Sequence, residues 1–166
     1  SHVIKKYFKN FKKIGKPFNE KIFKKNCIIT IADTGLNTLT GGRLKKVSKY
    51  ILEKEFMLTY GDGVSNVNLK KLLNFHNKNK KLITVTAVRP PARFGEIIIS
   101  NNKVRSFVEK PQVVTSWING GFFVVKKEFL KFIRSDKEIL EKYPLEMACK
   151  KKQLGAFKHE GVWKCM

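Results

Sequence analysis

The sequence predicts an α/β fold in which a mainly parallel sheet is covered by helices on both faces. Short apolar runs rich in β-branched residues alternate with segments of helical period, a pattern typical of strands joined by right-handed crossovers. Two further apolar runs flank a short polar turn and predict an antiparallel hairpin. The 166 residues are enough to bury a core, and we expect one domain spanning residues 1–166.

The first half of the chain carries the alternation. Apolar residues from Val3 to Phe11 recur at helical spacing, and a polar connection follows around Gly15. Strands are expected at residues 27–32, 56–59 and 83–88. Helices are expected at residues 43–54 and 69–76. The second of these helices closes in a lysine run, which suits the negative end of its dipole.

The second half changes character after the third strand. The runs 95–99 and 104–108 flank a polar turn at residues 100–103 and predict the hairpin. A strand at residues 118–125 contains a pair of glycines. The remaining elements are expected to be helices at residues 126–134 and 144–152 and a strand at residues 155–159.

The formal net charge of +22 raises the possibility of a nucleic-acid-binding protein. Only five of the 35 basic residues are arginines, although arginine is the usual reader of bases and phosphates through its planar fork. We therefore interpret the charge mainly as a solvated lysine coat and expect no specific nucleic-acid partner. Its positive field still attracts anionic, phosphorylated substrates.

The chain shows no pattern of a membrane or secreted protein. No apolar run is long enough to span a bilayer, and no signal peptide is recognisable. Cys27, Cys149 and Cys165 are odd in number and scattered, which favours a reducing cytoplasm over a disulfide framework. No cysteine or histidine pair has zinc-ligand spacing. We expect a cytoplasmic protein without a membrane partner.

A single carboxylate, Asp62, follows an expected strand and lies between Gly61 and Gly63. Ligands in open α/β sheets bind outside the carboxyl ends of strands, and glycines let backbone and ligand approach closely. A carboxylate there suits a Mg²⁺ ion that bridges phosphate oxygens. The same residues are good turn chemistry, so they leave both a turn and a metal site open.

Four further clusters lie near expected element ends. The loop that ends in Gly41-Gly42-Arg43 either offers backbone N–H groups and a cation to an anion or simply caps a helix. The arginines within residues 89–95 either meet phosphate or face solvent. Glu109 suits a sugar hydroxyl and Lys110 suits a phosphate; alternatively, the two residues are simply the charged end of a strand. Asn119 suits polyol recognition, and the glycines after it allow either a bound ring or a bulge.

Taken together, these stretches resemble the sugar-1-phosphate nucleotidylyltransferases, and most closely the glucose-1-phosphate cytidylyltransferases. The motifs are DTGLNTLTGGRLKKV (33–47), LTYGDGVSNVNL (58–69), RPPARFGEI (89–97), FVEKP (107–111) and WINGGFFV (117–124). The resemblance implies a Rossmann-like sheet with an inserted hairpin region for the sugar. It also implies a Mg²⁺-dependent reaction of CTP with α-D-glucose 1-phosphate that gives CDP-glucose and pyrophosphate. The expected context is deoxysugar and O-antigen precursor synthesis by a homo-oligomer.

The resemblance assigns roles to individual residues of this chain. Asp62 matches the catalytic, metal-binding aspartate, with Gly61 beside the nucleotide. Thr38 and Arg43 match nucleotide-contacting positions. Lys110 matches the lysine that grips the sugar phosphate and aligns it for catalysis. The sugar side is completed by Gly95, Glu109 and Asn119.

The chain also departs from the family pattern. The family opens with a strand and a Gly-rich loop that cradles the triphosphate, and its second metal-binding aspartate follows the stretch that here ends at Met166. We therefore expect an internal fragment that lacks both ends and is inactive by itself. Two alternatives stay open: transfer of a uridylyl or thymidylyl group and, from another class, a basic nucleic-acid-binding protein.

Overall fold

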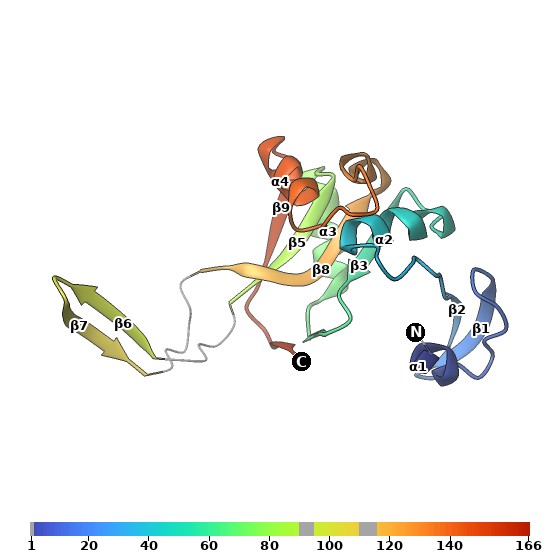
Figure 1. Ribbon diagram of the computed structural model, residues 1–166, viewed down its shortest axis with the longest axis horizontal. Coiled ribbons are helices and arrows are strands. Elements are labelled where there is room, and N and C mark those ends of the chain that lie inside the picture. The colour runs from blue at the N-terminus through green and yellow to red at the C-terminus, as the bar shows by residue number, and fades with distance from the viewer. Residues whose placement is uncertain (1, 90–94, 110–115) are drawn as a thin grey trace. The chain divides into compact units, whose positions relative to one another are not determined.

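The structure, a computed structural model, describes residues 2–89, 95–109 and 116–166 (Figure 1). Contacts between Cα atoms divide the chain into two compact units. The first combines residues 1–52 with 133–144, and the second combines residues 53–132 with 145–166. Within the described ranges, every helix is too short or too polar to cross a membrane.

The first unit begins with a short helix and a hairpin. Helix α1 covers His2–Tyr7, and strands β1 (Pro17–Ile22) and β2 (Lys25–Thr30) pair antiparallel. The sequence predicted β2 as a strand of the main sheet. Its partner in the described structure is instead β1, because a two-residue turn with positive φ at Phe23 and Lys24 returns the chain alongside itself.

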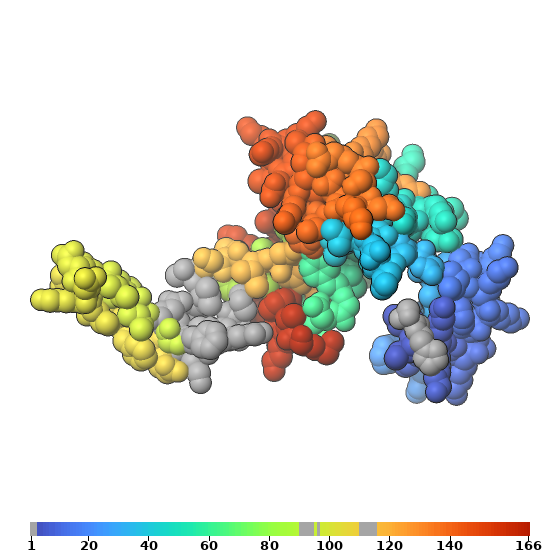
Figure 2. Space-filling model, in the orientation of Figure 1, coloured from blue at the N-terminus to red at the C-terminus, as the bar shows by residue number. Residues whose placement is uncertain are grey.

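Helix α2 (Thr40–Val47) forms the other half of the first unit and continues as a short 3₁₀ turn, η1 (Ser48–Tyr50). The segment of residues 133–144 packs onto α2, and its orange atoms lie against the cyan atoms of α2 in Figure 2. Leu44 of α2 is buried, as are Ile133 and Leu140 of the segment. The helix expected at residues 43–54 thus exists but ends earlier.

A four-stranded sheet with the order β3-β8-β5-β9 forms the centre of the second unit. Its strands are β3 (Glu55–Thr59), β5 (Ile83–Val88), β8 (Ile118–Lys126) and β9 (Leu154–His159). Strands β5 and β9 pair parallel, and β8 pairs antiparallel with both β3 and β5. Three strands therefore run in one direction, and the α/β class is confirmed. The described sheet is mixed, because β8 lies between β3 and β5 and runs antiparallel to both.

Both faces of this sheet are covered, as predicted. Phe123, Val124 and Val125 follow one another along β8, and each is at most 1% exposed. Since successive side chains of a strand point to opposite faces, burial of all three requires cover on both sides. Helix α3 (Leu69–Asn79) packs against β5, β8 and β9. The other helical segments are η2 (Lys127–Phe132) and α4 (Tyr143–Lys150).

Two small antiparallel pairs complete the second unit. Strands β6 (Glu96–Ser100) and β7 (Lys103–Val108) form the predicted hairpin, whose turn places Asn101 and Asn102 at φ of 51° and 58°. Asparagine tolerates this left-handed backbone, which a two-residue hairpin turn requires. The second pair joins β4 (Gly63–Ser65) to β10 (Trp163–Cys165), neither of which was predicted.

A buried histidine lies under the sheet. His76 of α3 has no exposed surface, and its Nδ1 lies 2.8 Å from Thr84 Oγ1. Its Nε2 lies 3.2 Å from Glu55 Oε2, but not in hydrogen-bond geometry. Burial lowers the pKa of His76 below its ordinary value of 6.5; the carboxylate of Glu55 raises it in part, and the ammonium of Lys126 lowers it further.

We expect the chain to lose stability as the pH falls below 6.5. Above that value His76 is neutral in both states, whereas below it the unfolded chain binds a proton that the folded chain resists. The free energy of unfolding, measured with urea between about pH 5 and 8, is therefore expected to decrease towards acid. His76→Gln is expected to flatten this decrease, while Lys78→Gln on the exposed face of α3 retains it. An unchanged slope in His76→Gln would contradict the assignment.

Candidate functional site

The loop of residues 33–39 connects the hairpin to α2 and contains one predicted nucleotide contact, Thr38. Gly35 N donates to Asp33 Oδ1 at 2.9 Å, and Gly35 adopts a φ of 88°, so the loop bends where only glycine fits easily. Arg43, from the first turns of α2, reaches back to this loop. Its Nη1 donates to Thr34 Oγ1 at 2.6 Å and its Nη2 to Leu36 O at 3.2 Å.

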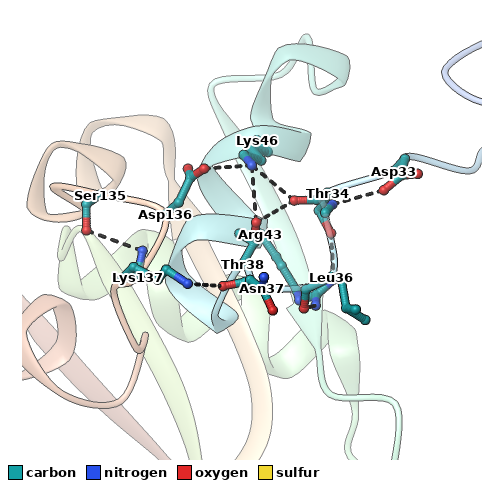
Figure 3. A network of polar contacts seen from close by, with 11 residues as sticks. Asp33, Thr34, Leu36, Asn37, Thr38, Arg43, Lys46, Ser135, Asp136 and Lys137 are labelled. Carbon is teal, nitrogen blue, oxygen red and sulfur yellow. Dashed lines mark hydrogen bonds and ion pairs between the residues drawn. The ribbon is translucent and has the colours of Figure 1, made fainter.

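Lys46, one turn further along α2, ties the same loop from another side (Figure 3). Its Nζ donates to Thr34 O and Thr38 Oγ1, both at 3.1 Å, and pairs with Asp136 Oδ2 at 2.7 Å. Thr38 Oγ1 in turn donates to Thr34 O at 2.5 Å. Thr34 is thus the hub of the network, because its hydroxyl holds Arg43 and its carbonyl holds Lys46 and Thr38.

This geometry gives the two predicted residues different capacities. Thr38 is 6% exposed and its only proton is donated to Thr34, so it meets a ligand only as an acceptor or after that bond breaks. Arg43 has five N–H donors and donates two hydrogen bonds to the loop. A cavity of about 260 Å³ opens beside it, lined also by Lys5, Asp33, Thr34 and apolar side chains. Arg43 is therefore the better placed of the two to meet an anion.

The glycines before Arg43 serve packing in this structure. The segment of residues 136–138 crosses the start of α2, and Gly41 N and Gly42 N donate to Glu138 O at 3.0 and 3.3 Å. A Cβ on Gly41 would lie 2.9 Å from Glu138 O, and one on Gly42 would collide with the backbone of Asp136. The sequence left an anion cradle and a capped helix open. The described N–H groups here favour the capped helix, since a protein carbonyl already occupies them.

Asp62, the predicted metal ligand, lies at the junction of β3 and β4 in the second unit. Its side chain is exposed, and Cys165 Sγ lies 3.7 Å from its Oδ2. Strand β10 pairs with β4 so that Cys165 is opposite Gly63, and Met166 N donates to Asp62 O at 2.9 Å. The last described residue of the chain therefore lies directly alongside Asp62. Gly61 is exposed as well, and nothing lies within 4 Å of a Cβ placed on it.

One carboxylate is a sufficient protein ligand for Mg²⁺, which keeps several waters and takes further oxygens from substrate phosphates. Within the described ranges, no three His, Cys, Asp or Glu side chains gather into a metal site. The oxygens of Asp62 are hard donors at an exposed strand end, so they fit Mg²⁺ as a single ligand. A soft thiol such as Cys165 does not suit this ion.

Asn119 lies on β8, and its side chain is already engaged. Its Nδ2 donates to Tyr60 Oη at 3.1 Å, and its Oδ1 accepts from Gly121 N at 2.9 Å. A Cβ on Gly121 would lie 2.7 Å from the Tyr60 ring, and one on Gly120 would lie 2.8 Å from a methyl of Val88. Of the two readings of this glycine pair, the structure therefore favours a bulge packed by protein side chains, and a register shift lies beside it.

Gly95 and Glu109 lie together at the open end of the hairpin. The register of β6 and β7 pairs Glu96 with Val108, and a Cβ on Gly95 would lie 2.9 Å from Glu109 Oε2. The sequence had assigned both residues to the sugar side. Lys110 and the arginine at position 93 lie outside the described residues.

The structure thus groups the predicted residues by element: Thr38 with Arg43, Gly61 with Asp62, and Gly95 with Glu109. Sequence reasoning missed Thr34, Lys46 and Asp136, which hold the loop before α2. Thr34 and Lys46 were quoted only as part of the motif of residues 33–47, and Asp136 comes from a segment about 100 positions away in sequence. Tyr60, the partner of Asn119, was quoted only as part of the motif around Asp62.

Comparison with known proteins identifies the family to which this chain belongs. The family model described as "Nucleotidyl transferase" matches residues 4–164. The glucose-1-phosphate cytidylyltransferase of Salmonella typhimurium is 42% identical over 139 residues, which cover 83% of this chain and 54% of that protein. The probable glucose-1-phosphate cytidylyltransferase of Bacillus subtilis is 35% identical over 136 residues, or 81% of this chain and 53% of that protein.

The fold has a solved counterpart in HddC from Yersinia pseudotuberculosis. The TM-score is 0.59 at 24% sequence identity, and the match covers 82% of this chain and 60% of that one. The chain spans about half the length of the curated relatives it matches.

We expect Gly42→Ala to destabilise the chain by about 1–3 kcal/mol, the usual cost of overpacking. Alanine is the better helix former by up to about 1 kcal/mol, but its Cβ would collide with the backbone of Asp136. Gly61→Ala, where nothing lies within 4 Å of the new Cβ, is the matched control and is expected to change stability by less than about 0.5 kcal/mol. Urea unfolding measures both. Equal stabilities of the two variants would contradict the packing role of Gly42.

Proposed function

The chain belongs to the nucleotidyl transferase family, and from this premise we propose that it is part of an enzyme that transfers a cytidylyl group from CTP to α-D-glucose 1-phosphate. CDP-glucose and pyrophosphate are the products. The observation that carries the proposal is the 42% identity, across 83% of the chain, to an enzyme named for this activity. The match to the family model, residues 4–164, includes all of the candidate residues.

Positioning and charge neutralisation are the main requirements of phosphoryl-type transfer, because the phosphate oxygen of the sugar phosphate attacks the α-phosphorus of CTP in line. Arg43 is proposed to bind the nucleotide with the donors that its contacts to Thr34 and Leu36 leave over. Thr38 acts on the same nucleotide as an acceptor. Lys46 orients the loop, since its Nζ bridges Thr34, Thr38 and Asp136.

Asp62 is proposed to hold Mg²⁺, with Gly61 leaving room for the nucleotide. The bound ion supplies charge neutralisation on the phosphates. The exposure of Asp62 at the end of a strand supports this role, because its oxygens are accessible to an ion that also contacts phosphate.

The sugar side is proposed to form around the hairpin and β8. Glu109 accepts hydrogen bonds from sugar hydroxyls, Gly95 keeps the backbone close, and Asn119 contributes its amide. Lys110 is proposed to grip and align the sugar phosphate. We also retain a cytoplasmic location, a homo-oligomer, and a place in deoxysugar or O-antigen precursor synthesis as parts of this proposal.

A chimera tests the proposal: residues 4–164 replace the matching part of the Salmonella enzyme. We expect it to form CDP-glucose from CTP and glucose 1-phosphate, and to use UTP, dTTP, GTP and ATP less well. Asp62→Asn is expected to reduce the rate on the order of 100-fold or more, because metal binding contributes several kcal/mol.

Glu53→Gln, which removes another exposed carboxylate of the same unit, is the control and is expected to keep the rate. A rate for Asp62→Asn equal to that of the control would exclude the metal role. Faster turnover of UTP or dTTP than of CTP would replace the cytidylyl assignment by the corresponding nucleotide.

A further inference from the structure

Two cations meet the ring of Trp117 at one end of the main sheet. The guanidinium carbon of Arg89 lies 4.3 Å from the centroid of the Trp117 ring, and Lys158 Nζ lies 5.5 Å from it. The three residues come from three neighbouring strands. Arg89 follows the last residue of β5, Trp117 precedes the first residue of β8, and Lys158 is next to last in β9 (Figure 1).

Strand register puts Asn119 on the same face as these three residues. Ala87 pairs with Asn119 on one side and with Lys158 on the other, so these side chains share a face. Val88 pairs with Ile118 in the next row, which points to the opposite face. One residue further on, Arg89 and Trp117 return to the face of Asn119, in agreement with their contact to Lys158.

The cluster has an electrostatic imbalance. Arg89 and Lys158 are both exposed, both are positively charged, and both contact the same indole ring. In the part of the chain that the structure describes, neither forms an ion pair with a carboxylate. The electron-rich ring attracts both cations but carries no net charge, so their mutual repulsion is not neutralised. An anion placed between them would neutralise it.

We propose that Arg89, Lys158 and Trp117 form a binding site for a phosphate monoester, presented by the sugar phosphate. Their shared face with Asn119 favours the sugar phosphate over the nucleotide, since the second N–H of the Asn119 amide, which its bond to Tyr60 leaves over, suits a polyol hydroxyl. The identity of the sugar, glucose 1-phosphate, rests on the proposed function. The phosphate site itself rests only on this cluster.

Trp117 positions the cations and does not stack on the ligand. A lysine and an arginine on a free surface lose much side-chain freedom when they bind an anion. Contact with a rigid indole orders both beforehand, so less freedom is lost when phosphate arrives. The arginine adds a planar fork that matches two phosphate oxygens, and the lysine adds a point charge.

Calorimetric titration of the 166-residue chain at low salt tests this site. Glucose 1-phosphate is expected to bind, inorganic phosphate to bind more weakly, and glucose not to bind measurably. Arg89→Gln and Lys158→Gln are each expected to weaken binding about tenfold, as for loss of a hydrogen bond to a charged group. Lys151→Gln is the matched control, because Lys151 also lies over an aromatic ring, Phe132, at 5.7 Å.

Fluorescence locates the site. Of the two tryptophans, Trp117 alone lies in the cluster, so phosphate binding is expected to change emission in the wild-type chain and not in Trp117→Phe, which retains Trp163. Circular dichroism checks that each variant is folded. Lys151→Gln is expected to bind within twofold of wild type.

Three results would overturn the proposal: no binding of glucose 1-phosphate by the wild-type chain, unchanged affinity in both Arg89→Gln and Lys158→Gln, or tighter CTP binding with the same dependence on these residues. The last result would assign the site to a phosphate of the nucleotide and not to the sugar phosphate. Failure of the proposed function gives a different result, because a chimera that makes no CDP-glucose leaves the phosphate titrations unaffected. Asp62→Asn is expected to abolish transfer and to keep this binding.

Discussion

The second unit depends on one steric constraint: strand β8 passes between β3 and β5 without side chains at positions 120 and 121. The missing Cβ of Gly120 makes room for Val88 at the end of β5, and that of Gly121 makes room for the ring of Tyr60 after β3. The backbone of the same glycines accepts hydrogen bonds from Trp163 Nε1 at 2.8 Å and Tyr60 N at 3.0 Å. The ends of β3, β5 and β10 are therefore fixed by one pair of residues.

The same kind of constraint operates independently in the first unit. There the backbone of residues 136–138 lies so close to the start of α2 that only glycine fits at positions 41 and 42. Glycine pairs beside polar residues suggest ligand loops in a sequence, because both ligands and backbone need the space that a missing Cβ leaves. In this chain both pairs are filled by protein.

Sequence reasoning succeeded where local chemistry determines the structure. The β-branched residues of β5 predict a strand, and the Asn101-Asn102 pair predicts the turn of the hairpin, because each signal lies within the element itself. Sequence reasoning failed where a strand forms or is placed through pairing with residues far away in the sequence. Strand β10 is three residues long and exists through its partner β4, and the insertion of β8 between β3 and β5 leaves no local signal. The turn at Phe23 and Lys24 has positive φ without glycine or asparagine, so β1 could not be inferred.

Hydrogen-bonding capacity distinguishes the two cations of the candidate site, Lys46 and Arg43. Lys46 has three N–H donors, and three acceptors surround it: Thr34 O, Thr38 Oγ1 and Asp136 Oδ2. It cannot bind a phosphate without giving one of them up. Arg43 has five donors and uses two groups to grip the loop, so its contacts fix its orientation and still leave donors for an anion. The network around Thr34 therefore uses all three donors of Lys46 to hold the loop, whereas it fixes the orientation of Arg43 and leaves some of its donors over.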